Sequence, residues 1–263
     1  MSTTLFQVDA FTDQPFKGNP AAVCILQEPT PDEWKQSLAA EMNLSETAFL
    51  LPENGDWRLR WFTPKTEVDL CGHATLASAR VLFELHPNLR DRSIKFHTRS
   101  GLLAARWVDD MVELDFPAMV PERIEVSHGV ESILGVNVVT GVCSGDYFLF
   151  EAESDRAVRD AAPDFRALAE SAMPEVILTA RSDNPAFDFI SRFFAPQLGI
   201  DEDPVTGSAH CLLAPYWAEK LGKKVFDAYQ ASKRGGRLHV RLVGERVRIS
   251  GAARLIFSAE LLV

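Results

Sequence analysis

The stretch Arg60-Trp61-Phe62-Thr63-Pro64 returns as Arg192-Phe193-Phe194-Ala195-Pro196, 132 positions later in a chain of 263 residues. Two further matches follow in the same order at a separation of 135 positions, Gly72-His73-Ala74 with Gly207-Ser208-Ala209 and Gly101-x-Leu103 with Gly236-x-Leu238. A repeat at a fixed, domain-sized separation predicts two similar domains and excludes a solenoid of short units. The chain is therefore interpreted as a duplication.

Each half contains one segment that is apolar on nearly every side, residues 74–83 in the first half and 209–221 in the second. A helix without a polar face must be buried all round. After each helix comes a pair of alternating segments joined by a short turn, which predicts a β-hairpin. These hairpins are 102–107 with 111–116 around Asp109-Asp110, and 238–242 with 246–249 around Gly244-Glu245. Each half is thus predicted to be a central helix wrapped by strands.

The domain boundary is expected in the segment from Pro117 to Glu122. We predict an N-terminal domain over 1–117 and a C-terminal domain over 118–263, with a final strand that returns to the first domain. A further helix is expected from Pro31 to about Met42, with Thr30 as its N-cap residue. A duplicated enzyme usually keeps its site in the cleft between its halves.

The composition is that of an ordinary globular protein, with 46% apolar and 24% charged residues. The net charge of −10 argues against nucleic acid and anionic membranes as partners, although it leaves a small anionic substrate possible. The four cysteines are far apart and the six histidines are scattered, so no disulfide framework and no metal site is expected. Without a signal-like or membrane-spanning stretch, we expect a cytoplasmic protein.

The two glycine motifs mark the predicted chemical site. Gly72-His73 and Gly207-Ser208 stand at the N-terminal ends of the two buried helices, where backbone N–H groups lack helical partners and the helix dipole is positive. Glycine allows a ligand to approach this backbone closely. Two such ends are suited to bind a carboxylate or an enolate-like anion, whereas the simpler interpretation is that each glycine only permits a tight turn.

Acid–base candidates lie nearby. Glu46 precedes an apolar strand and is a candidate base with a raised pKa, or else a surface cap. Asp203 precedes the second helix and is either a site carboxylate or a turn-forming residue. His73 is a candidate acid or a structural histidine. Cys71 lies where a helix N-terminus lowers a thiol pKa, or else packs in the core.

These motifs resemble the phenazine-biosynthesis PhzF-like isomerase family over the chain from about residue 5 onward. The stretches that carry the resemblance are 18–23 (GNPAAV), 43–49 (NLSETAF), 60–64 (RWFTP), 67–75 (EVDLCGHAT) and 203–210 (DPVTGSAH).

The resemblance implies an α+β, diaminopimelate-epimerase-like fold of two pseudo-symmetric domains, each a β-barrel around a central α-helix. It also implies a homodimer. The implied site needs no cofactor and acts on a small carboxylate by proton transfer at carbon. Carried over by motif, the catalytic residues are Glu46, His73 and Asp203, and the substrate-binding residues are Asn19, Gly72, Gly207 and Ser208.

Two other functions stay open. Proline racemases and diaminopimelate epimerases use a thiol before the glycine of each half, and the chain has Cys71 in the first position but Thr206 in the second. This departure leaves a hydroxyproline-dehydratase-like enzyme as the nearer alternative. The other alternative is a silent small-molecule-binding or scaffold protein.

Overall fold

A computed structural model describes residues 3–262 of the chain. The chain divides into two compact units, Met1–Asp115 together with Ser250–Val263, and Phe116–Ile249. The predicted boundary after residue 117 lies two residues from this division. The strand that joins the first unit from the far end of the sequence is β18 (Ala253–Leu261).

Unit 1 is built mainly from strands around one long helix. The helices are α1 (Asp32–Met42), α2 (Gly72–Leu85) and the 3-10 turn η1 (Pro87–Leu89). The strands are β1 (Thr3–Ala10), β2 (Asn19–Ile25), β3 (Glu46–Glu53), β4 (Asp56–Phe62), β5 (Glu67–Val68), β6 (Ile94–Thr98), β7 (Gly101–Val108), β8 (Met111–Pro117) and β18.

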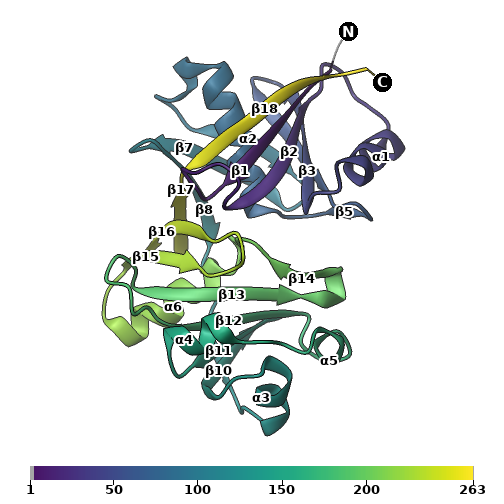
Figure 1. The fold of residues 1–263 in the computed structure, drawn as a ribbon. Coiled ribbons are helices and arrows are strands. Elements are labelled where there is room, and N and C mark those ends of the chain that lie inside the picture. The colour runs from purple at the N-terminus through teal and green to yellow at the C-terminus, as the bar shows by residue number, and fades with distance from the viewer. Residues whose placement is uncertain (1–2, 263) are drawn as a thin grey trace. The chain divides into compact units, whose positions relative to one another are not determined.

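The strands of unit 1 alternate between parallel and antiparallel neighbours. β1 lies antiparallel to both β2 and β18, β2 is parallel to β3, and β3 is antiparallel to β4. β4 is parallel to β6, which is antiparallel to β7. In Figure 1 the purple β1 and the yellow β18 run side by side although they come from opposite ends of the sequence.

The apolar helix α2 is buried as predicted, and every residue from Gly72 to Ala79 is buried. Small alanines on several faces let strands approach it closely, and it packs against β1, β2, β3, β7 and β18. Its exposed residues come only in the last turns, at Arg80 and beyond. This packing fixes the position of the helix N-terminus, where the chemistry is expected.

The turn before β2 requires its glycine. Gly18 has φ +64°, and a Cβ atom there would lie 2.1 Å from the carbonyl oxygen of Ala10. No side chain fits in this space, so the Gly18-Asn19-Pro20 turn carries Asn19 into a fully buried position at the start of β2.

The expected cap of α1 is wrong by one residue. Its N-cap is Pro31, and no side chain caps the helix. Thr30 instead donates from Oγ1 to the carbonyl oxygen of Glu28, while its own carbonyl oxygen accepts from the buried Lys35 ammonium at 2.5 Å. Lys35 also donates to the Asp32 carboxylate at 3.0 Å, so it links the residue before the helix to the first helical turn.

Unit 2 uses the same plan with more short helices. Its helices are α3 (His128–Leu134), α4 (Asp155–Asp160), α5 (Phe165–Ala169), η2 (Pro196–Leu198) and α6 (His210–Leu221). The strands are β9 (Glu122–Ile124), β10 (Val138–Ser144), β11 (Tyr147–Ala152), β12 (Glu175–Arg181), β13 (Phe189–Ala195), β14 (Ile200–Asp203), β15 (Val225–Gln230), β16 (Gly236–Val243) and β17 (Arg246–Gly251).

Strand pairing in unit 2 repeats that of unit 1. β10 is antiparallel to β11, β11 is parallel to β12, and β12 is antiparallel to β13. β13 is parallel to β15, which is antiparallel to β16. β9 lies along β10 in the place that β18 takes along β1. The order of parallel and antiparallel pairs is therefore the same in both units, as the sequence repeat predicts.

The buried helix of unit 2 begins less regularly than its counterpart. Gly207, Ser208 and Ala209 form a turn whose hydrogen bonds run from His210, Cys211 and Leu212 back three residues. Pro215 lies inside α6 and has no N–H for the carbonyl oxygen of Cys211. The backbone N–H of Met119 donates to that oxygen at 3.0 Å and satisfies it.

Candidate functional site

The first cluster stands at the N-terminus of α2. Cys71 is the N-cap residue, in an extended conformation, and its carbonyl oxygen accepts from both the N–H and the hydroxyl of Thr75, at 3.1 and 2.5 Å. These bonds hold the first turn, so that the side chain of His73 is fixed relative to the helix end. Gly72 between them is buried and opens the helix.

His73 links two other functional groups through its two ring nitrogens. Nδ1 lies 3.5 Å from Sγ of Cys71, and Nε2 lies 3.2 Å from Oε2 of Glu46. The side chains of His73 and Glu46 are only 5% and 12% exposed. Glu46 is therefore no surface cap. Sequence reasoning placed Glu46 and His73 in one site, and the structure brings them into contact.

Burial and pairing together define what this cluster can do. In the tautomer that is protonated on Nε2, Nδ1 can accept from the Cys71 thiol, and Nε2 lies 3.2 Å from the Glu46 carboxylate oxygen. The carboxylate then keeps lone pairs that can accept a proton from a bound molecule. This is the geometry of an oriented base, with an imidazole able to give or take the proton.

The same three side chains also form the candidate metal cluster among the described residues, since one ligand atom from each lies within 4.8 Å of the others. A thiolate, an imidazole and a carboxylate suit zinc. However, Cys71 lies against Nδ1 of His73 and Glu46 lies against Nε2. A metal ion bound to one of these nitrogens has only the residue on that side as a second ligand, and the residue on the other side lies outside its coordination shell. The arrangement is a row of two pairwise contacts, thiol to imidazole and imidazole to carboxylate, more than a three-ligand cage.

The second cluster surrounds the turn before α6. Asp203 ends β14, is 7% exposed, and accepts a hydrogen bond from the hydroxyl of Thr206. Gln230, fully buried on β15, donates to the carbonyl oxygen of Asp203 at 2.9 Å and accepts from the N–H of Thr206 at 2.8 Å. Asp203 is thus both a turn-forming residue and a buried carboxylate, so the two interpretations of it do not exclude each other.

Ser208 meets two residues that sequence reasoning missed. The hydroxyl of Tyr147 donates to Oγ of Ser208 at 2.9 Å, and the same hydroxyl is hydrogen-bonded to the carboxyl group of Glu175. Burial raises the pKa of Glu175, and the charges of Asp146 and Asp203 add to this rise, against the opposing hydrogen bond from Tyr147. Burial likewise raises the pKa of the Tyr147 hydroxyl.

A signal for Glu175 was present in the sequence. Glu175 is the first residue of an apolar strand, as Glu46 is, and in each half the next strand along the chain carries the repeated arginine motif. The separation of the two glutamates is 129 positions, whereas the other repeats are 132 or 135 positions apart, so the fixed separation does not reveal this pair. No such pattern marks Gln230 in the sequence, because only the position of β15 in the fold brings Gln230 to Asp203 and Thr206.

The predicted site residues therefore fall into two groups. Glu46, Gly72 and His73 lie together in unit 1, with Asn19 buried at the start of β2 in the same unit. Asp203, Gly207 and Ser208 lie along one turn of unit 2. Cys71 and Thr206 occupy equivalent positions, one before each glycine, and each is held by the hydrogen bonds of its own turn.

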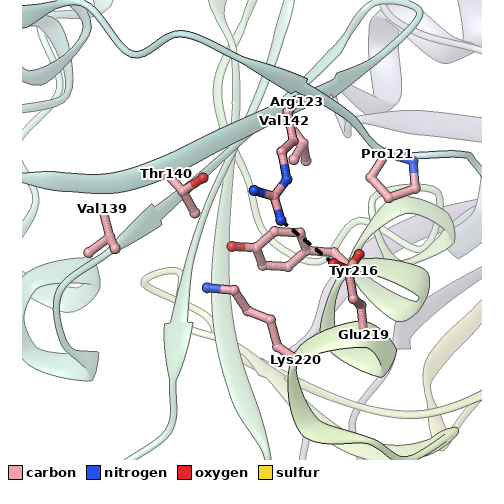
Figure 2. A pocket seen from close by; sticks show the side chains of 8 residues that line it. All are labelled: Pro121, Arg123, Val139, Thr140, Val142, Tyr216, Glu219 and Lys220. Atoms are coloured by element: carbon pink, nitrogen blue, oxygen red, sulfur yellow. Dashed lines mark ion pairs between the residues drawn. The ribbon is translucent and has the colours of Figure 1, made fainter.

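A pocket of about 280 Å³ in unit 2 is separate from these groups. Figure 2 shows Arg123, Tyr216 and Lys220 around it, with Arg123 paired to Glu219 at 3.7 Å. The described residues that line it include none of the predicted site residues. It offers no acid–base group positioned as Glu46 is, and we do not assign the chemistry to it.

Comparison with known proteins identifies the family. The family model for phenazine biosynthesis-like proteins matches residues 8–259. A protein named as an uncharacterised isomerase of Halalkalibacterium halodurans is 49% identical over 266 residues, covering all of both chains. The crystal structure of a PhzF family protein from Enterococcus faecalis is 42% identical with a TM-score of 0.96, again over all of both chains.

A more distant structure confirms the fold class. A hydroxyproline epimerase from Agrobacterium vitis, solved with bound trans-4-hydroxy-L-proline, is 14% identical with a TM-score of 0.64 and covers 99% of this chain and 92% of its own. At that identity the likeness concerns the fold alone, which is the predicted α+β, diaminopimelate-epimerase-like arrangement of two similar halves. The long match of the family model and the near-half identity over the full length show that the chain belongs to the phenazine biosynthesis-like PhzF family.

Proposed function

We propose that the protein is a cofactor-independent isomerase that moves a proton between carbon atoms of a small carboxylate, with Glu46 as the base. The observation that carries this proposal is the contact of Glu46 with His73 at the N-terminus of α2, 3.2 Å from oxygen to nitrogen and almost fully buried. The names of close relatives as isomerases and the hydroxyproline bound to a distant one support the reaction type and the substrate class.

Binding of the substrate carboxylate is assigned to the helix ends. The first N–H groups of α2 have no acceptor within the helix, and Gly72 leaves room for an anion to approach them. The turn at Gly207 and Ser208 offers the same chemistry in unit 2. We propose that the turn at Gly72, with Asn19, binds an anionic group in unit 1, and that the turn at Gly207 and Ser208, with Asp203, does so in unit 2.

The chemical step follows from the placement of the base. Glu46 takes a proton from the carbon next to an electron-withdrawing group, and the electron pair of the broken C–H bond moves into the conjugated system. The proton is returned at another carbon, which gives an isomer. His73 holds the Glu46 carboxylate through Nε2 and keeps it directed during both steps.

The racemase-like alternative has less support. Two-base racemisation by thiols needs a cysteine before each glycine, and unit 2 has Thr206 hydrogen-bonded to Asp203 at that position. A silent binding protein keeps its ligand but shows no exchange at carbon, so the experiment below separates that alternative as well. The cytoplasmic location and the homodimer stay predictions. Light scattering on the purified protein measures whether it is a dimer.

The test is replacement of Glu46 by glutamine, which keeps the shape and removes the proton acceptor. Small carboxylates are incubated with the protein in D₂O, with trans-4-hydroxy-L-proline as the first probe, and C–H exchange is followed by ¹H NMR. We expect Glu46→Gln to lower the exchange rate by on the order of 10²–10⁴-fold with little effect on folding or probe binding.

Glu41→Gln, an exposed change in α1, is the matched control and is expected to exchange as wild type does. Exchange by Glu46→Gln at the wild-type rate contradicts the assignment and directs attention to Cys71. Binding of carboxylates without exchange by the wild-type protein supports the silent binding protein instead.

A further inference from the structure

We propose that the indole N–H of Trp61 donates a hydrogen bond to a carboxylate oxygen of the molecule bound beside Glu46, and so adds a side-chain donor to the anion site of unit 1. Neither the glycine motifs nor the acid–base candidates include Trp61, and every group that this inference uses belongs to unit 1. The inference rests on the proposed function, since it names a group that holds the substrate of the same site.

The indole nitrogen of Trp61 is buried and has no hydrogen-bond acceptor among the described residues. Native proteins carry few such groups, because a buried donor without a partner is destabilising. Trp217 is buried to the same degree, with 1% of its surface exposed as for Trp61, yet its indole N–H donates to Oγ1 of Thr179 at 3.1 Å. The N–H of Trp61 is explained if a ligand supplies its acceptor.

The duplication shows that packing does not require an indole at this position. Trp61 in the first arginine motif corresponds to Phe193 in the second, 132 positions later. Phe193 is also buried, and its ring packs against that of Tyr147 with centroids 6.2 Å apart. A phenyl ring, which has no N–H, thus fills the equivalent position in unit 2. The indole donor is present in the unit that carries the contact between Glu46 and His73.

The strand registers place Trp61 on the same face of the sheet as Glu46. Trp61 on β4 is the antiparallel partner of Ala48 on β3, and Glu46 lies two positions before Ala48. Side chains two positions apart on a strand share a face, and diagonal neighbours on adjacent strands lie about 7–8 Å apart, within reach of an aromatic side chain. Phe62, next along β4, lies on the opposite face, where its ring meets that of Phe49 edge-on at 5.4 Å.

Different helices cover the two faces of this part of the sheet. The face of Phe49 packs against α1. The face of Glu46 lies at the N-terminus of α2, because Nε2 of His73 is 3.2 Å from Oε2 of Glu46. The indole of Trp61 therefore lies on the side of the sheet where the first N–H groups of α2 are, and not on the side of α1.

A carboxylate bound at the N-terminus of α2 supplies the acceptor that Trp61 lacks. The neighbouring-strand partners of Trp61 and Glu46 are Ala48 and Ala21, so the residues beside both groups are small. When Glu46 removes a proton from the carbon next to the carboxylate, negative charge moves onto the carboxylate oxygens and strengthens a hydrogen bond from the indole. The bound molecule thereby satisfies the buried donor, and the donor stabilises the charge that the reaction creates.

The first test asks whether the N–H of Trp61 has a permanent partner, and it needs no substrate. Benzothienylalanine, in which sulfur replaces the indole N–H, is introduced at position 61 and, as the matched control, at position 217. We expect the replacement of Trp217 to lower the melting temperature, because it breaks the bond to Thr179, and that of Trp61 to leave it unchanged or raise it. An equal or larger loss at position 61 shows that Trp61 is already satisfied and overturns the proposal.

The second test detects the bond to a ligand. In protein labelled with ¹⁵N, Trp61→Phe identifies the indole signal of Trp61 in the NMR spectrum, and acetate and trans-4-hydroxy-L-proline are the probes. We expect the bound carboxylate to move this signal to lower field, in wild type and in Glu46→Gln alike, and to leave that of Trp217 in place. A Trp61 signal that neither probe moves overturns the proposal.

The indole donor and the isomerase can fail separately. Exchange at carbon that depends on Glu46, together with a Trp61 signal that no probe moves, refutes the donor alone. A shifted Trp61 signal without exchange refutes the isomerase alone and leaves a carboxylate-binding site. Where exchange occurs, we expect benzothienylalanine at position 61 to lower its rate by on the order of 10²–10³-fold, and the same change at position 217 to retain it. An unchanged rate at position 61 overturns the proposal.

Discussion

Two histidines of this chain, His73 and His210, show how position decides the task of one residue type. His73 lies between a thiol and a carboxylate at a helix end. His210, three residues after Gly207, is fully buried, stacks on Phe189, and bonds through Nδ1 to the carbonyl oxygen of Thr206 at 2.9 Å. Thr75 makes the equivalent bond in unit 1. His210 is therefore a structural residue of the turn.

Burial lowers the pKa of His210 from 6.5 to about 4, which makes unit 2 sensitive to acid. Below pH 6.5 the unfolded chain binds a proton that the folded chain refuses, so stability falls as the pH drops from 6.5 towards 4. The loss amounts to roughly 3 kcal/mol at most. Urea unfolding at several pH values measures it, and His210→Asn is expected to show a shallower slope. The exposed change His128→Asn should leave the slope unchanged, and an equal effect of both changes would speak against this account.

Metal ions are expected to inhibit the protein and not to assist it. The thiol of Cys71 and Nδ1 of His73 are 3.5 Å apart, close to the edge of a tetrahedral zinc site with bonds of about 2.3 and 2.0 Å. Zinc there blocks the helix end and ties up the imidazole that directs Glu46. We expect added Zn²⁺ to abolish exchange activity and a chelator to restore it, while a chelator alone leaves the untreated enzyme active.

Cys71→Ser is expected to weaken zinc inhibition, whereas Cys143→Ser, at a thiol outside both clusters, should not. Loss of activity on chelation alone would show instead that a resident metal takes part in the reaction.

At the scale of elements, the repeated arginines join strands into rigid pairs. Arg60 on β4 bonds to Glu67 on β5, and Arg192 on β13 bonds to Glu202 on β14, with N–O distances of 2.6 and 2.7 Å. Each guanidinium also lies over the phenylalanine two residues later. These pairs fix β5 and β14, and β14 carries Asp203. The arginine motif that revealed the duplication thus has a structural task in both units.

Arg192 is the more constrained of the two and gives a stability prediction. Its side chain is 12% exposed and also donates to the carbonyl oxygens of Val158 and Ala161. Lysine cannot reproduce this planar set of donors. We expect Arg192→Lys to lower the free energy of unfolding by roughly 1–3 kcal/mol, as judged by urea denaturation. Arg156→Lys, at an 88% exposed surface pair, should change it by less than about 0.5 kcal/mol. Comparable effects at both positions would refute the structural role.

For the whole molecule, the duplication was the part that sequence could predict best. The glycine motif, the apolar helix and the hairpin recur in order, and these signals are local. The central helices, most strands and the positions of Gly72, His73, Gly207 and Ser208 at the helix ends followed from them. The α1 cap failed because the helix begins one residue later, after Pro31, and the Thr30 hydroxyl donates to the carbonyl oxygen of Glu28 and does not cap the first turn. Tyr147 and Gln230 could not be found, since their roles arise from strand registers that bring distant residues together. Among the described residues, no helix combines the length and the apolar character needed to cross a membrane.

The return of β18 to β1 sets the order in which the molecule can be completed during synthesis. All of unit 2 leaves the ribosome before β18 does, although β1 is made first. Unit 2 can therefore fold while β1 still has an open edge, and unit 1 closes only when residues 253–261 arrive. A chain ended after residue 249 should keep unit 2 intact and make unit 1 the preferred target of limited proteolysis. Equal resistance of both units to the protease would mean that unit 1 folds without β18. The N-terminal part of a nascent chain could then fold completely long before translation ends.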